Sequence, residues 1–143
     1  MKIRLAALLI VSGCAAPAPP GAIERSIDGV RVFERSGEGS NTLIVQDAIE
    51  WRGRFTVESG CLLLSIDGRD YTPIFASSSA ARTALGDVGP TAPRLGASSW
   101  SLQGSRIPEA DAAGPSKATG ACGKPPFLVS SLSDPKPLPI ARP

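Results

Sequence analysis

Three cysteines are the residues whose chemistry can be argued from position alone. A thiol can be acylated, can join a second thiol in a disulfide, or can act as a nucleophile. Cys14 directly follows an apolar segment near the N-terminus, whereas Cys61 and Cys122 are far apart in the remaining chain. That wide spacing excludes a Cys-x-x-Cys redox motif. We therefore expect Cys14 to have a different role from the other two.

The residues before Cys14 have the composition of an export signal. Lys2 and Arg4 supply positive charge, Leu5–Val11 is uncharged and apolar, and small residues follow. The apolar run is far shorter than the ~20 residues of a membrane-spanning helix. Residues 15–20 are rich in proline, which cannot extend a helix. The pattern predicts a signal peptide over residues 1–13 and not a transmembrane anchor.

Val11-Ser12-Gly13-Cys14 resembles the lipobox of bacterial lipoproteins. The resemblance implies cleavage before Cys14, a diacylglyceryl group on its sulfur and an acyl chain on its amino group. Several acyl chains give a stable membrane anchor. Ala16 stands where an aspartate would favour the inner membrane, which implies the outer membrane. The alternative is an ordinary secretory signal cleaved after an alanine near residue 16 or 18, with Cys14 incidental.

If Cys14 is acylated, Cys61 and Cys122 remain as an even pair in an oxidising compartment. We expect them to form a disulfide. A bridge that closes a loop of this length should stabilise the fold by roughly 4 kcal/mol in the chain-entropy model. The alternative is two free thiols, one of them reactive.

Composition excludes several functions. Without Lys2 and Arg4, the mature chain has 13 Lys and Arg against 13 Asp and Glu, so it is formally neutral. No basic cluster is present, and we expect no nucleic-acid partner. The sequence has no histidine. Ser-His-Asp and Cys-His catalysis are therefore excluded, and the commonest ligand of transition metals is missing. We expect no cofactor.

The remaining candidates for chemistry have simpler explanations. Ser133-Asp134-Pro135-Lys136 fits the Ser-x-x-Lys string, but its proline prevents the helix that would align serine and lysine. Ser116-Lys117 lies in an expected loop. Asp67 and Asp70 offer too few oxygens for calcium and fit a hairpin turn. Glu50 and Glu58 are too far apart along one strand for paired acid-base work, so we expect surface charges.

Hydrophobic patterning predicts short strands. Apolar and polar residues alternate from Ile49 to Glu58, which is the clearest strand pattern. We expect further strands at 43–45, 61–66, 71–75, 97–102 and 127–130, and one or two helical turns at 76–85 with a serine N-cap. Pro73 is expected at an edge or a bulge, because it donates no ladder hydrogen bond. The loop at 108–121 is expected to have no regular structure.

These elements favour a small closed barrel of five or six strands. The segments Gly60–Leu64, Tyr71–Phe75 and Cys122-Gly123 are similar to those of small uncharacterised envelope proteins with an OB-like barrel and one bridge, over residues 43–131. The resemblance implies an all-β fold and no activity. We expect a tether at 14–41, with at most an edge strand, the barrel at 42–131, and a proline-rich disordered tail at 132–143.

The main aromatic residues are expected to form the core, since Trp51 and Phe55 share the apolar face of their strand. We therefore expect a non-catalytic envelope protein, anchored through Cys14, that presents the barrel to the periplasm as a structural or interaction module. Its partner would be the membrane, with an envelope protein or a glycan as a further candidate. The alternative is a module that binds a glycan or another small ligand, which would need exposed aromatic side chains. An enzyme is the weakest of the three.

Overall fold

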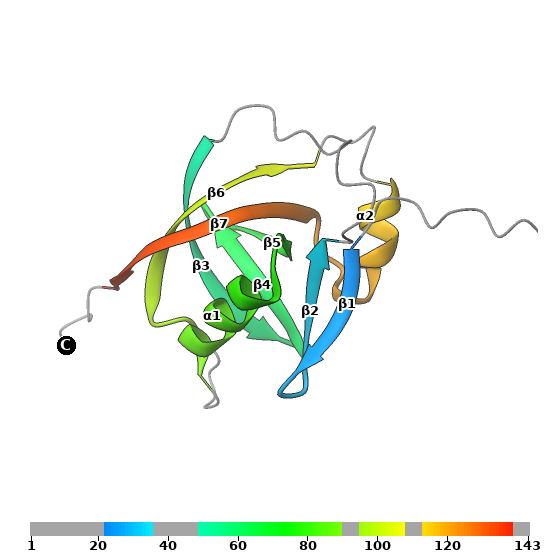
Figure 1. Cartoon of the computed structure of the whole chain (residues 1–143), viewed down its shortest axis with the longest axis horizontal. Helices are drawn as coiled ribbons and strands as arrows, with labels where there is room; N and C mark the ends of the chain where they lie inside the picture. The colour runs from blue at the N-terminus through cyan, green and yellow to red at the C-terminus, as the bar shows by residue number, and fades with distance from the viewer. Residues whose placement is uncertain (1–21, 36–48, 90–94, 108–112, 139–143) are drawn as a thin grey trace, which may run out of the picture.

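The computed structural model describes residues 22–35, 49–89, 95–107 and 113–138. They form a mostly β structure with two short α-helices and one 3₁₀ helix (Figure 1). The elements in chain order are β1 (Ala22–Ile27), β2 (Val30–Arg35), β3 (Ile49–Glu58), β4 (Cys61–Ile66), β5 (Arg69–Phe75), α1 (Ser78–Val88), β6 (Ser98–Arg106), α2 (Ala113–Ala118), η3 (Gly120–Cys122) and β7 (Pro126–Pro137).

Three two-residue turns determine which neighbouring strands pair. Asp28-Gly29, Ser59-Gly60 and Asp67-Gly68 all have φ between 50° and 77° at both positions. Turns of this kind match the twist of antiparallel strands and favour Asp, Asn and Gly. They join β1 to β2, β3 to β4 and β4 to β5, and each pair is antiparallel. The expected hairpin at Asp67-Gly68 is therefore confirmed.

Six strands close into a barrel. β3 pairs with β4 on one side and with β6 on the other, β6 pairs with β7, β7 pairs in parallel with β5, and β5 returns to β4. β2 is the sixth strand and lies between the start of β4 and the end of β5, through the pairs Arg31–Cys61 and Phe33–Ile74. The expected all-β closed barrel is confirmed.

Pro73 lies inside the sheet and not at an edge, contrary to expectation. It pairs with Phe127 of β7 on one side. On the other side, the pairing of β5 with β4 stops at Tyr71, and the pairing with β2 begins at Ile74. Pro73 therefore falls where β5 changes partner. Because neither β4 nor β2 pairs with Pro73 on that side, its missing N–H costs no ladder hydrogen bond there.

α1 covers one side of the core. The Ser77 hydroxyl caps its first turn by accepting a hydrogen bond from the Ala80 amide at 3.3 Å, which confirms the expected serine cap. The helix extends to Val88 and packs Ala81, Ala84 and Val88 against the barrel. At its last turn, the Asp87 carboxylate accepts hydrogen bonds from the Ser98 amide and the Trp100 indole at 3.2 and 3.1 Å. α1 is thus fixed to the first residues of β6.

The domain begins earlier and ends later than the sequence indicated. Part of the expected tether forms β1 and β2, because Val30 and Val32 are buried with α1 in the main core. Part of the expected disordered tail belongs to β7, which continues to Pro137 beside β6. Beyond Val129, β7 pairs with β6 alone, so its other edge tolerates proline.

Other expectations have mixed outcomes. The strands at 49–58 and 61–66 have the expected bounds, and the one expected from residue 97 continues without interruption to Arg106. The segment 108–121 was expected to be irregular, but α2 and η3 lie within it. Pro115 is compatible with α2 because it stands in the first helical turn, where a missing N–H costs little. The strand expected at 43–45 lies outside the described residues.

Gly104 lies at a close approach of β6 and β7 within the barrel wall. A Cβ atom at this position would overlap the Leu128 carbonyl oxygen and lie 2.9 Å from Cε1 of Phe127. The register between β6 and β7 also shifts between Gln103 and Gly104. A side chain here would push apart two strands of the closed ring.

We expect Gly104→Ala to lower the free energy of unfolding by about 1–3 kcal/mol, because the overlap forces the backbone to move. Gly86→Ala is the matched control, since a Cβ at that helical position meets no atom within 4 Å. The control should be neutral or stabilise the fold by up to about 1 kcal/mol. Urea unfolding of both variants measures the difference. Equal midpoints would show that the β6–β7 approach is not tight.

Candidate functional site

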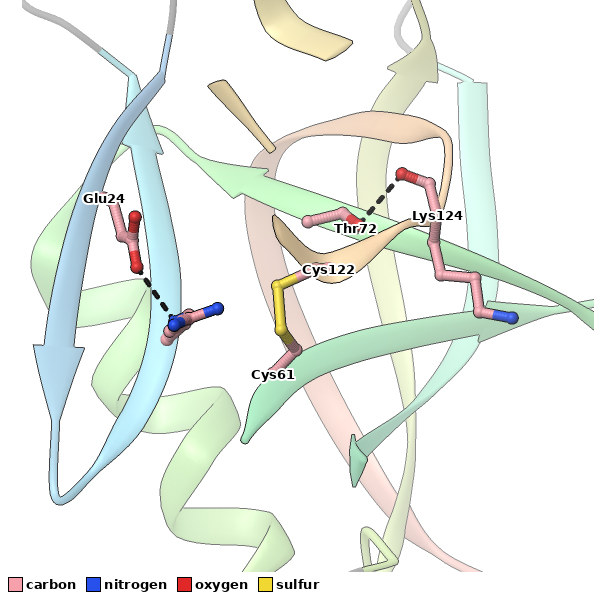
Figure 2. Close-up of a disulfide and its surroundings, with 6 residues drawn as sticks. Glu24, Cys61, Thr72, Cys122 and Lys124 are labelled. Atoms are coloured by element: carbon pink, nitrogen blue, oxygen red, sulfur yellow. Dashed lines mark hydrogen bonds and ion pairs between the residues drawn. A yellow bond between two sulfur atoms is a disulfide. The ribbon is translucent and has the colours of Figure 1, made fainter. Parts of the chain in front are cut away.

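A disulfide joins Cys61 to Cys122, as expected. The Cα atoms are 5.8 Å apart, and Cys61 is buried as the first residue of β4. Cys122 ends η3, four residues before β7 begins. Figure 2 shows the bridge between the start of β4 and the segment that leads into β7. The bridge therefore ties together two strands that are not neighbours in the barrel.

Hydrogen bonds continue the attachment along β5. The Thr72 hydroxyl donates to the Lys124 carbonyl oxygen at 3.0 Å (Figure 2), and the Thr72 amide donates to the Pro125 carbonyl oxygen at 2.8 Å. Thr72 is fully buried. The Arg31 amide donates to the Gly60 carbonyl oxygen at 2.7 Å, just before Cys61. The bridge and the two hydrogen bonds of Thr72 hold residues 122–126 in one position against the barrel, and the Arg31 bond holds β2 beside Cys61.

The expected lipidation site, Cys14, lies outside the described residues. Within the ranges that the structure describes, no helix combines the length and the apolar character needed to cross a bilayer.

The structure does not bring the weaker catalytic candidates together. Ser133 and Lys136 lie on β7, where they face Ser101 and Ser99 of β6, so they have no common helical face. Ser116 and Lys117 lie on the short helix α2 and not in a loop.

The acidic candidates have structural roles. Asp67 forms the β4–β5 turn, and Asp70 pairs across it with Ser65. The Ser101 hydroxyl donates a hydrogen bond to Glu50, and Glu58 is exposed at the end of β3. No group of three or more Cys, Asp or Glu side chains in the described part of the chain is arranged to hold a metal ion.

The aromatic residues belong to the core, as expected. Phe55, Phe75 and Phe127 are fully buried, and Trp100 is 5% exposed. Trp51 is partly buried, and its indole N–H donates to the Gly104 carbonyl oxygen at 2.9 Å. The described structure therefore offers no row of exposed rings on which a ligand could stack.

A basic groove, which the sequence did not reveal, lies at the far end of β6 from α1. The Arg106 guanidinium carbon is 5.4 Å from the Trp51 ring centroid and 5.6 Å from that of Tyr71. A cavity of about 800 Å³ opens beside it, and its lining includes the basic residues Arg69, Arg106 and Lys124. These residues come from separate segments, and each alone resembles an ordinary surface charge. No sequence pattern would have grouped them.

A second cavity, of about 350 Å³, lies between the β1–β2 turn and α1. Its charged lining residues are Asp28 and Arg82, which have opposite signs. It therefore has no excess charge to select a ligand.

The chain matches no protein-family model, no curated protein and no solved structure.

Removing the bridge by the double substitution Cys61→Ala and Cys122→Ala should lower the free energy of unfolding by about 4 kcal/mol, because the unfolded chain regains the freedom of a loop that the bridge closes. Denaturant unfolding with and without a reductant measures the effect. The native chain should lose stability on reduction, and the double variant should not respond. Alkylation of both thiols in the folded, unreduced chain would contradict the bridge.

Proposed function

We propose that this chain is a lipid-anchored protein of the bacterial cell envelope. In this proposal, its barrel faces the periplasm, with the outer membrane as the expected site of attachment. The observation that carries the proposal is Val11-Ser12-Gly13-Cys14, directly after a short apolar run with positive charge before it. Acylation of the Cys14 sulfur and amino group would supply several chains, enough for stable anchoring.

The other cysteines support an exported location. The sequence has three cysteines, and two of them, Cys61 and Cys122, are joined to each other. The bridge therefore does not use Cys14. Disulfides persist in oxidising compartments and are rare in the cytosol. A bridge of this kind agrees with export by the signal peptide.

The short connection to β1 would keep the barrel near the membrane. Seven residues separate Cys14 from Ala22, the first residue of β1. Even a fully extended chain of this length spans no more than about 30 Å. The barrel would therefore work close to the lipid surface, as expected for a module that contacts other envelope components.

We assign the barrel a structural or interaction role and no catalysis. The sequence has no histidine, and the Ser-Lys candidates lie on elements that do not align them. The second candidate function is ligand binding, which the basic groove beside Arg106 favours.

Cys14→Ser tests the anchor. The native chain should be found with the membrane fraction, and the variant should be soluble because it has no sulfur to acylate. Intact-mass measurement should show a diacylglyceryl group and an acyl chain on the native N-terminus and neither on the variant.

The double substitution Cys61→Ala and Cys122→Ala is the matched control for loss of a thiol. It should remain in the membrane fraction, provided that the bacteria grow at a temperature where it folds. A native chain with an unmodified N-terminus, or one cleaved after residue 16 or 18, would disprove the anchor.

A further inference from the structure

We propose that the groove beside Arg106 binds an acidic oligosaccharide, a sugar chain that bears carboxylate or phosphate groups. The charges of the groove indicate an anionic ligand, and its size indicates a ligand larger than a single ion. The choice of a saccharide rests on the envelope location proposed above, because acidic sugars are abundant anions there.

Arg106 is positioned to bind an anion. It pairs with Phe127 across β6 and β7, and its guanidinium lies over the Trp51 and Tyr71 rings. Contact with aromatic faces holds the planar group without using its N–H donors. Within the described residues, no carboxylate forms an ion pair with Arg106. Its donors therefore remain available to a carboxylate or a phosphate.

Two further cations share the groove. Arg69 follows the β4–β5 turn, and Lys124 lies two residues after the bridged Cys122. The one carboxylate among the lining side chains is that of Asp70, so the groove has an excess of positive charge. The Thr72 hydrogen bond to the Lys124 carbonyl oxygen fixes the backbone at this position. The backbone that carries two of the three charges is thus already held by a tight turn or a bridge before a ligand binds.

The size of the groove argues against a small ion as the whole ligand. Its volume of about 800 Å³ is within the range of pockets for drug-sized molecules. Pro125, Pro126 and Ile107 add apolar surface to its lining. Sugar rings present C–H faces to such surfaces while their acidic groups reach the cations. A single inorganic anion would leave most of this surface uncovered.

Calorimetric titration of the full lipidated chain in detergent micelles tests the proposal. The probe is tetragalacturonate, and its fully methyl-esterified form is the neutral counterpart. We expect the acidic form to bind at low ionic strength, to weaken as salt is added, and to bind at least about tenfold more tightly than the ester. Equal binding of both forms, or no binding of the acidic form, would overturn the proposal.

Arg106→Gln should weaken binding of tetragalacturonate by about tenfold. Arg82→Gln, in the second cavity, removes the same charge elsewhere and should bind as the native chain does. Lys124→Gln is a further variant at an exposed position, for use if Arg106→Gln does not fold. Unchanged binding by the folded groove variant would disprove the site.

Two other comparisons separate the alternatives. If a ten-nucleotide oligothymidylate binds more tightly than tetragalacturonate, the ligand of the groove is a nucleic acid and not a saccharide. The Cys14→Ser chain should bind tetragalacturonate as the native chain does, since the groove does not include Cys14. If the anchor proposal is wrong, the binding of tetragalacturonate is unaffected. If the groove proposal is wrong, the attachment of the native chain to the membrane is unaffected.

Discussion

Four residues of β5, Thr72 to Phe75, run parallel to Pro126–Val129 of β7, and this pairing closes the barrel. Parallel pairing between distant segments is slow to form, because a long loop must close before any contact is gained. The Cys61–Cys122 bridge encloses all of β5, α1 and β6 in one covalent loop. The bridge therefore reduces the conformational freedom of the chain segment whose closure is the slow step in forming the barrel. The two hydrogen bonds of Thr72 then set the register of β7.

The N-terminal hairpin of β1 and β2 completes the barrel, although its sequence alone does not indicate this role. β2 covers the opening where β4 and β5 separate, and Pro73 occupies the point at which β5 changes partner. β2 has buried residues on both faces: Val30 and Val32 belong to the main core together with residues of α1, and Phe33 packs with Ile74. A strand buried on both sides does not show the alternation of apolar and polar residues that identifies a half-buried strand. Residues 30–35 do not show this alternation in full, and we expected a tether there with at most an edge strand.

The sequence predicted those features that depend on neighbouring residues. The alternation over 49–58, the Asp67-Gly68 turn and the serine cap of α1 are all local, and all are present. The bridge was predictable because only two cysteines remained once Cys14 was set aside. The continuation of β7 to Pro137 was not, because proline is excluded from a strand only where both edges are paired. The groove was equally hidden, since its cations meet only when β5, β6 and the start of β7 are assembled.

The bridge also connects the proposed location to the proposed binding site. Cys122 holds the segment that carries Lys124, and Lys124 contributes its carbonyl oxygen to Thr72 and its side chain to the groove. In a reducing compartment the thiols would stay free, and the start of β7 would lose its covalent attachment. Export would then precede formation of the bridge that holds the start of β7 beside the groove. In the proposed location, within about 30 Å of the lipid surface, the chain would thus gain this stabilisation where envelope ligands are present.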